Sequence, residues 1–280
     1  MSTTTTISAA EINKLRQATG AGMMDCRKAL TETNGDFEAA IDWLRKQGQK
    51  VAAKRSDREA KEGVVLAKTT ENHKSGIIIC VSCETDFVSK NADFVAFAQS
   101  IADAAVSNNV KTIDELNATK VDNSTVADLV NDKLASIGEK IGITKFERID
   151  APYVASYIHG ANRMGVLVGL NKEIAEAGKD VAMQIAAMNP VAVDAESVPA
   201  ETVERERSIA IEQMKQDPKM AGKTDDMLGK IAQGKLNAFF KEQTLLAQAF
   251  VKDAGKSVAD YLKDTDKDLK VIEFKRVALG

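Results

Sequence analysis

The spacing of apolar residues changes at Val64, and this change constrains the fold more than any other feature of the sequence. Before it, apolar residues recur at the helical intervals i, i+3, i+4 and i+7. After it come two β-branched, apolar runs, residues 64–69 and 76–83, which are separated by a polar turn. The sequence therefore predicts a helical N-terminal part followed by a body that contains a sheet.

Residues 1–52 are predicted to form a module of three short helices. Ser8 and Glu11 have the spacing of a capping box, so the first helix should begin there. The second should begin near Met23, and the third should follow Asp36, whose side chain can cap it. The charged stretch at residues 50–63 lacks an apolar stripe, which predicts a tether, placed at residues 53–62.

The rest of the body is predicted to contain two subdomains, each made of a sheet and helices. The first, residues 63–145, begins with the two apolar strands, and the uninterrupted apolar character of residues 76–81 indicates a strand buried on both faces. The second is formed by residues 146–198 together with residues 241–280, in which strands again precede a helix. The fold class expected from this order is α+β.

Residues 199–240 are predicted to form an antiparallel helical hairpin inserted into the second subdomain. Two amphipathic segments, 199–215 and 225–240, are joined by the helix-breaking string QDPKMAGKT. The pair is too short to be a stable coiled coil alone, so it should pack against the body, a second copy or another protein.

Composition excludes several classes of function. The 38 basic residues are balanced by 41 acidic residues, and a net charge of −3 gives no support to direct nucleic-acid binding. The sequence has no export signal at its start and no run of about 18 apolar residues, so a cytoplasmic protein outside the membrane is expected. In a reducing compartment its three cysteines should remain thiols.

The search for catalytic motifs does not favour an enzyme, and neither a cofactor nor a metal is predicted. A partial phosphate-loop match at residues 229–235 fails because Leu236 stands where Ser or Thr should bind Mg²⁺, and the segment is predicted to be helical. Cys80 and Cys83 should point to opposite faces of a strand, which favours burial. With two histidines in the chain, a histidine-based centre has too few candidates.

The turn that follows the buried strand is the most informative segment. It contains Thr85, Asp86, Phe87 and Val88, at the point where the chain passes from strand to helix. In one interpretation Asp86 caps the helix and Phe87 fills the core. In the other, the loop presents an aromatic side chain to a partner, with a carboxylate beside it. Both interpretations are open from the residues alone.

Several strings, in order along the chain, resemble signatures of the elongation factor Ts family. They are KLRQATGAGMMDCRKAL at 14–30 with NGD at 34–36, CETDFV at 83–88, YIHG at 157–160 with GVLV at 165–168, and AMQIAA at 182–187. Order and spacing agree over essentially the whole chain. The sequence is identified on this basis as resembling a bacterial-type elongation factor Ts.

The resemblance implies a ubiquitin-associated-like N-terminal module and a guanine nucleotide exchange factor that binds elongation factor Tu. In the family, the loop matching Thr85, Asp86, Phe87 and Val88 enters the nucleotide domain of the partner, displaces Mg²⁺ and so promotes GDP release. The resemblance also implies further partner contacts, for which the sequence alone suggests a surface arginine, core methionines and a solvated histidine. These residues are Arg16, Met23, Met24 and His159.

Three points stay open after the resemblance. The complex can be a 1:1 pair or a 2:2 assembly containing a homodimer. Gln184 and Ala249 depart from residues common in the family, His and Pro, which leaves their local contacts uncertain. The rival functions are a peptide-binding adaptor or chaperone, and a thiol oxidoreductase that uses Cys80 and Cys83.

Overall fold

The N-terminal module contains three helices, α1 (Ala9–Thr19), α2 (Met23–Glu32) and α3 (Phe37–Lys54). The structure is a computed structural model that describes residues 7–55, 57–217 and 224–280. The predicted capping box is present: the amide of Glu11 donates to the hydroxyl of Ser8, and the Glu11 carboxylate accepts from the Ser8 amide. Residues 1–6, where no export signal is expected, lie outside the described part of the chain.

Helix α3 is longer than predicted and reaches the body. The helix continues through the first five residues of the charged stretch at 50–63, so residues 53 and 54 of the tether expected at 53–62 are helical. Along its length α3 packs on α7 (Val126–Ile137), and a Cβ added at Gly48 would lie 2.9 Å from the Cβ of Ala135. Val51 then packs against the core of the body, which supports the extra turn. Of the expected tether, residue 56 lies outside the described residues.

The first sheet has strand order β1-β2-β5 and is antiparallel throughout. All nine residues of β2 are buried, as the apolar run at residues 76–81 predicts for the middle of the strand, and Ser75 and Ser82 are buried as well. Helices α5 and α7 cover the outer face of the sheet through a shared apolar cluster. The strands are β1 (Glu62–Thr69), β2 (Ser75–Cys83) and β5 (Gly142–Asp150), and the connecting elements are α4 (Asp86–Ser89), α5 (Ala92–Ser107), α6 (Ile113–Ala118), β3 (Lys120–Val121) and β4 (Ser124–Thr125).

The second sheet has strand order β10-β7-β6 and is also antiparallel. Helix α8 covers its outer face, and α11 belongs to the same apolar cluster. The strands are β6 (Tyr153–His159), β7 (Met164–Leu170) and β10 (Val271–Ala278), and the other elements are α8 (Ala175–Met188), the 3₁₀ helix η2 (Leu245–Ala247), β8 (Ala249–Phe250), β9 (Asp253–Ser257) and α11 (Val258–Thr265).

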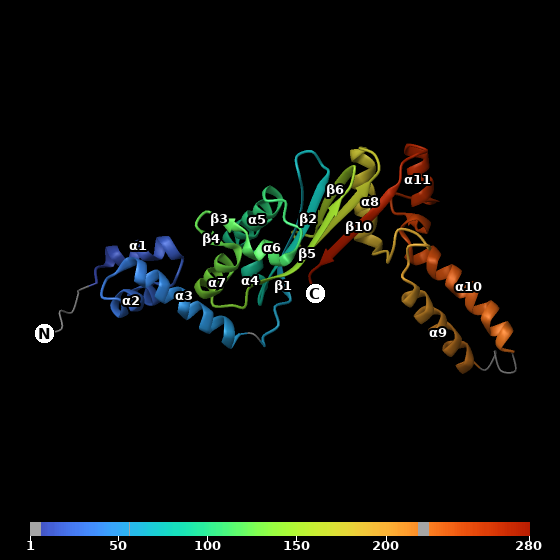
Figure 1. The fold of residues 1–280 in the computed structure, drawn as a ribbon. Coiled ribbons are helices and arrows are strands. Elements are labelled where there is room, and N and C mark those ends of the chain that lie inside the picture. The colour runs from blue at the N-terminus through green and yellow to red at the C-terminus, as the bar shows by residue number, and fades with distance from the viewer. Residues whose placement is uncertain (1–6, 56, 218–223) are drawn as a thin grey trace.

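The inner faces of the two sheets pack against each other, so helices, sheet, sheet and helices form four layers (Figure 1). Val65 and Ile78 from the first sheet share this interface with Val154 and Leu167 from the second. The sheets approach so closely that a Cβ at Gly165 would lie 3.1 Å from a methyl group of Val65. The structure contains both helices and sheets, with a three-helix module at its N-terminus. This confirms the expected α+β class.

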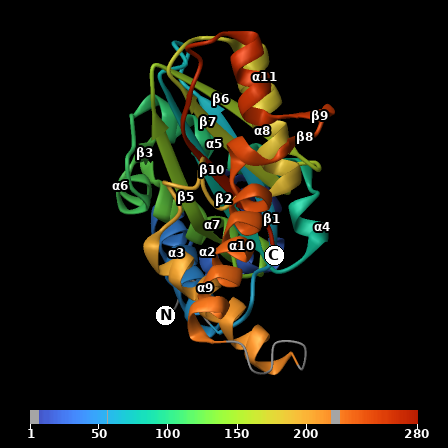
Figure 2. The same ribbon diagram turned by 90° about the vertical axis from the view of Figure 1, so that its right-hand side faces the viewer.

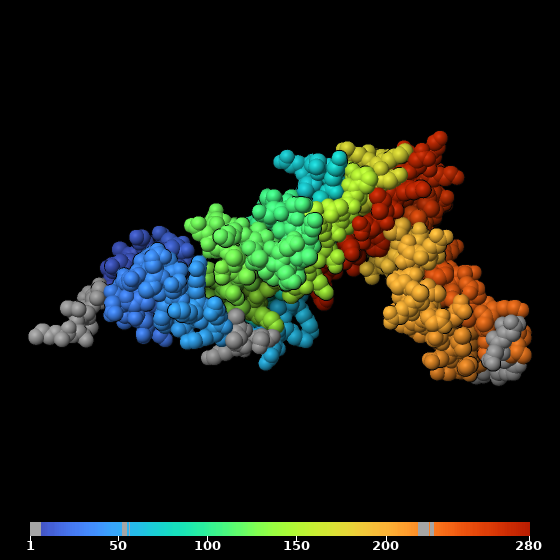
Figure 3. Space-filling model, in the orientation of Figure 1, coloured from blue at the N-terminus to red at the C-terminus, as the bar shows by residue number. Residues whose placement is uncertain are grey.

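Helices α9 (Ala200–Gln216) and α10 (Asp225–Gln243) pack on each other as an antiparallel pair. Ala210 and Met214 of α9 meet Leu228 and Ala232 of α10 in a small apolar cluster. The pair projects away from the body (Figure 3). Most of the predicted connection lies at residues 218–223, outside the described residues. Among the described helices, none has the length and apolar character needed to cross a membrane.

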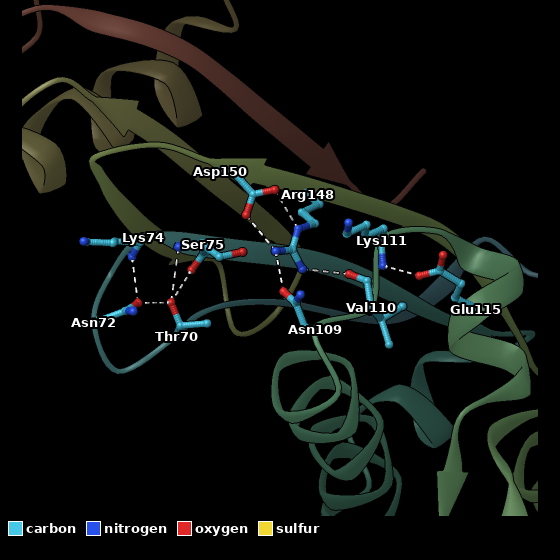
Figure 4. A network of polar contacts seen from close by, with 10 residues as sticks. All are labelled: Thr70, Asn72, Lys74, Ser75, Asn109, Val110, Lys111, Glu115, Arg148 and Asp150. Carbon is cyan, nitrogen blue, oxygen red and sulfur yellow. Dashed lines mark hydrogen bonds and ion pairs between the residues drawn. The ribbon is translucent and has the colours of Figure 1, made fainter.

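A polar network closes one end of the first sheet (Figure 4). The guanidinium of Arg148 donates to both carboxylate oxygens of Asp150, to the side-chain oxygen of Asn109 and to the carbonyl of Val110. These bonds fix the loop after α5 against β5. Ser75 opposes Asp150 in the strand pairing, so the β1–β2 turn lies at this same end. The candidate functional site lies at the opposite end of the sheet.

Candidate functional site

Three chain segments meet where β2 ends. Cys83, the last residue of β2, pairs with Glu62 at the start of β1, while Ser82 pairs with Gly142 at the start of β5. Antiparallel pairing therefore brings the residues after β2, those before β1 and those before β5 to one place. The turn from β2 into α4 begins there, and α4 lies at the outer edge of the molecule (Figure 2).

Two glutamates, Glu84 and Glu139, hold this turn against the segment before β5 by hydrogen bonds in both directions. The carboxylate of Glu139 accepts hydrogen bonds from the amides of Glu84 (3.2 Å) and Thr85 (3.0 Å) and from the Thr85 hydroxyl (2.7 Å). In return, the carboxylate of Glu84 accepts from the amide of Lys140 at 2.6 Å. Carboxylates that accept amide hydrogens form strong, charge-assisted bonds. The backbone at residues 84–85 is thus held from both sides.

Two arginines from the segment before β1 bind the carboxylate of Glu84. Arg55 donates to one carboxylate oxygen at 2.6 Å, and Arg58 donates to the other at 3.0 Å. The Lys140 ammonium in turn donates to the carbonyl of Arg58 at 2.9 Å. The amide of Lys140, followed by the two arginines, lowers the pKa of Glu84 from 4.5 to about 2.

The pKa of Glu84 gives a pH dependence with a defined sign. Because the pKa is lowered in the folded state, the carboxylate stabilises the protein above pH 4.5, and this contribution is lost as the pH falls toward 2. We expect Glu84→Gln to lower the free energy of unfolding at pH 7. The difference from the wild type should shrink steadily between pH 5 and pH 2.5 in urea titrations. If the difference in free energy of unfolding between the wild type and Glu84→Gln were the same at pH 5 and at pH 2.5, the lowered pKa of Glu84 would be contradicted.

The loop itself presents Phe87 to solvent. Thr85 is the N-cap residue of α4, and Asp86 forms an ion pair of 2.7 Å with Lys90 one turn later. Phe87 is 84% exposed, whereas Val88 packs against the apolar core. The interpretation that Phe87 fills the core is therefore wrong, and the structure leaves the other interpretation, in which the loop presents an aromatic side chain to a partner.

The other predicted contact residues lie apart from this loop. Arg16 is an exposed residue of α1, and Met23 and Met24 in the first turn of α2 are 50% and 69% exposed, so the methionines are not core residues. His159 is exposed at the end of β6, where its Nδ1 lies 3.0 Å from the hydroxyl of Tyr157. It lies near the same end of the body as the loop, because the β6–β7 turn contacts the start of β1 through the ion pair of Arg163 with Glu62.

Sequence reasoning missed the residues that hold the loop, namely Arg55, Arg58, Glu84, Glu139 and Lys140. Glu139 and Lys140 precede β5, and the register of β2 with β5 brings them beside residues 84–85, a pairing for which the sequence alone gives no signal. The two arginines belong to a segment that was interpreted only as a polar tether.

Neither rival motif has the geometry its chemistry requires. Cys80 faces the other sheet and Cys83 faces the helices, as predicted for residues three apart in a strand. Burial raises the pKa of both thiols, and that of Cys83 reaches about 12 with the help of the nearby Glu139 and Glu62 carboxylates. A thiol with so high a pKa is a poor nucleophile. Residues 229–235 lie within α10, as predicted, and not after a strand.

A helical module, a layered body and an exposed aromatic on a held turn are an arrangement that suits a factor acting through contact with another protein. The family described as "Elongation factor TS" matches residues 84–280. An elongation factor Ts of Christiangramia forsetii is 49% identical over 277 residues, covering 98% of this chain and 99% of the relative. That of Cytophaga hutchinsonii is 48% identical over 280 residues, with the same coverage. The chain belongs to the elongation factor Ts family.

Proposed function

We propose that this chain is a guanine nucleotide exchange factor for elongation factor Tu and promotes GDP release during translation in the cytoplasm. Membership of the elongation factor Ts family supports this proposal. The structural observation that carries it is the 84% exposure of Phe87 on a turn held by Glu84 and Glu139. A side chain in this position can enter a partner without first leaving the core of its own protein.

The proposed mechanism requires no covalent step. Thr85, Asp86, Phe87 and Val88 enter the nucleotide domain of the GTPase and displace Mg²⁺ from it. Loss of this cation removes the charge that neutralises the phosphate oxygens of GDP. Factor and GDP then weaken each other's binding, and this coupling free energy is reciprocal. The factor stabilises the nucleotide-free GTPase, to which GTP can bind.

The remaining exposed residues supply affinity in this proposal. Arg16, Met23 and Met24 present a mixed basic and apolar surface on the N-terminal module, residues 1–52, which suits a helix of the partner. His159 contacts a second domain of the GTPase. We assign the body to two subdomains, residues 63–145 and residues 146–198 with 241–280, and the hairpin to self-association within a 2:2 complex.

Reciprocal coupling provides the equilibrium test. The affinity of the chain for elongation factor Tu is measured by titration calorimetry without nucleotide and with saturating GDP. We expect saturating GDP to raise the dissociation constant of the chain for elongation factor Tu by a factor of ten or more. Each factor of ten corresponds to about 1.4 kcal/mol of coupling free energy. Equal affinities in the two titrations would overturn the proposal, because a ligand that does not discriminate between states cannot shift their equilibrium.

Deletion of the hairpin tests whether it is dispensable for GDP release, as its assignment to self-association requires. Residues 199–240 carry none of the residues assigned to the loop, and the pair stands away from the body (Figure 1). We expect a chain with a short linker in their place to retain GDP release within about threefold of the wild type, because the loop and its supports are untouched. Release that falls to the spontaneous rate, in a variant that remains folded, would contradict the assignment.

A further inference from the structure

We propose that Arg55 and Arg58 are positioning residues that set the direction of the Phe87 loop and couple it to the N-terminal module. This inference rests on the proposed exchange function. It adds residues outside the loop and outside the surfaces assigned to partner binding. It also gives the segment between module and body a role beyond that of a tether.

The first observation is the convergence on Glu84. One carboxylate receives the Arg55 guanidinium at 2.6 Å, the Arg58 guanidinium at 3.0 Å and the Lys140 amide at 2.6 Å. The side chain of Glu84 is only 14% exposed and that of Arg55 25%, so the Arg55–Glu84 pair is largely shielded from water, whereas Arg58, at 59% exposure, meets the carboxylate from the solvent side. Shielded, hydrogen-bonded pairs are screened less by salt than pairs at the open surface.

The second observation is the position of Glu84 in the chain. It lies directly before Thr85 and three residues before Phe87. Because the ring of Phe87 is mostly exposed, packing holds it little, and its direction follows from the backbone at residues 84–86. Small errors in the placement of a group that acts in a partner's site reduce its effect strongly. A fixed Glu84 therefore matters more for the action of the loop than for the stability of the fold.

The third observation is the continuity between Arg55 and the module. Arg55 follows α3 directly, and its amide donates to the carbonyl of Val51 within the last turn. Helix α3 is itself docked on α7 by the close approach of Gly48 to Ala135 and by the 3.8 Å pair of Arg45 with Asp132. The surface with Met23 and Met24 and the exposed ring of Phe87 thus belong to one connected unit. Contact at the module then sets where the ring enters the partner.

The test uses the full chain with Arg55→Gln and Arg58→Gln together. Amide hydrogen exchange of residues 84–90 is followed first, without any partner. We expect exchange in this segment to become about fivefold to tenfold faster, because the turn opens locally while the body stays closed. The unfolding temperature should fall by only a few degrees, because Glu84 keeps the bond from the Lys140 amide, and hydrogen exchange in the rest of the body should stay at the wild-type rate. The control is Lys61→Gln, which removes one of the nearby positive charges, against two in the double variant, from a side chain that is 68% exposed and paired with Glu59.

The second measurement is GDP release from elongation factor Tu at increasing concentrations of each variant. We expect the maximal rate of the double variant to fall about threefold to tenfold, while the half-saturating concentration stays within about twofold, because the affinity surfaces are intact. Arg55→Lys with Arg58→Lys, which keeps both charges, should restore a part of the rate. An effect through stability alone would lower the amount of folded protein without changing these two constants per folded molecule.

Two results would overturn the inference. Unchanged hydrogen exchange at residues 84–90 would show that the arginines do not hold the turn. Faster exchange with an unchanged maximal rate would show that holding the turn does not matter for release. Failure of the proposed nucleotide exchange function would give a different result. In that case the wild type itself would not accelerate GDP release, whether or not the arginine variants show faster hydrogen exchange.

Discussion

We expect Phe87→Ala to unfold like the wild type and yet to release GDP from elongation factor Tu ten to a thousand times more slowly. The ring is 84% exposed, so its removal opens no cavity, and the free energy of unfolding should change by about 0.5 kcal/mol or less. Loss of a central interface aromatic costs roughly 2 to 4 kcal/mol of interaction, and each 1.4 kcal/mol corresponds to a factor of ten in rate.

The matched control for this variant is Phe94→Ala. Phe94 lies seven residues later in α5 and is only 1% exposed, so its truncation should lower the free energy of unfolding by about 3 to 5 kcal/mol. Urea titrations measure both stabilities, and release of a fluorescent GDP analogue measures the rates. A Phe87→Ala variant that is destabilised like Phe94→Ala, or that releases GDP at the wild-type rate, would contradict the assignment.

Gln184→Ala should lower the stability of the second subdomain strongly, although it replaces a polar residue. Gln184 is fully buried in α8. Its side-chain amide donates to the Gln248 side chain and the Ala249 carbonyl, and its oxygen accepts from the Val251 amide at 2.8 Å. Truncation leaves buried groups without partners and opens a cavity, which should lower the free energy of unfolding by about 2 to 4 kcal/mol.

Two further variants separate burial from amino-acid type. Gln184→His should cost less than Gln184→Ala because a ring N–H can replace one donation. Gln233→Ala, on the exposed face of α10, should stay within about 0.5 kcal/mol of the wild type in the same urea titrations. Equal effects of alanine at positions 184 and 233 would show that the buried hydrogen bonds contribute nothing.

The two departures from the family pattern are thus local in their contacts. Gln184 keeps the end of α8 bonded to the segment around β8. The bond to position 249 uses the carbonyl of Ala249, while its side chain is exposed. A proline at 249 would offer the same carbonyl, so the departure leaves this bond unaffected.

Local chemistry explains which parts of the fold were predictable. Ser8 with Glu11 forms the capping box because both groups lie within one turn, so their spacing in sequence is sufficient information. The apolar run at residues 76–81 predicted burial of β2 on both faces, because successive side chains of a strand point to opposite faces and all of these are apolar. The opposite directions of Cys80 and Cys83 followed from the period of a strand in the same way.

Features that depend on distant parts of the chain were not predictable from the residues. The extension of α3 through Lys54 relies on packing against α7, which overrides the polar character of the segment. The exposure of Phe87 could not be derived, because the neighbouring Phe94 and Phe97 offered equally good aromatic candidates for the core. The supports from Glu139, Arg55 and Arg58 depend on the strand register, which sequence spacing alone does not fix.

The central claim is that this chain drives GDP out of elongation factor Tu in competition with Mg²⁺. The most direct measurement is stopped-flow release of a fluorescent GDP analogue from elongation factor Tu, at increasing concentrations of the chain and at several Mg²⁺ concentrations. We expect the rate to rise above spontaneous release and to saturate with the chain, and to fall as Mg²⁺ increases, because cation and loop favour different states of the GTPase. A rate that stays at the spontaneous value at every concentration of the chain would contradict the proposed function.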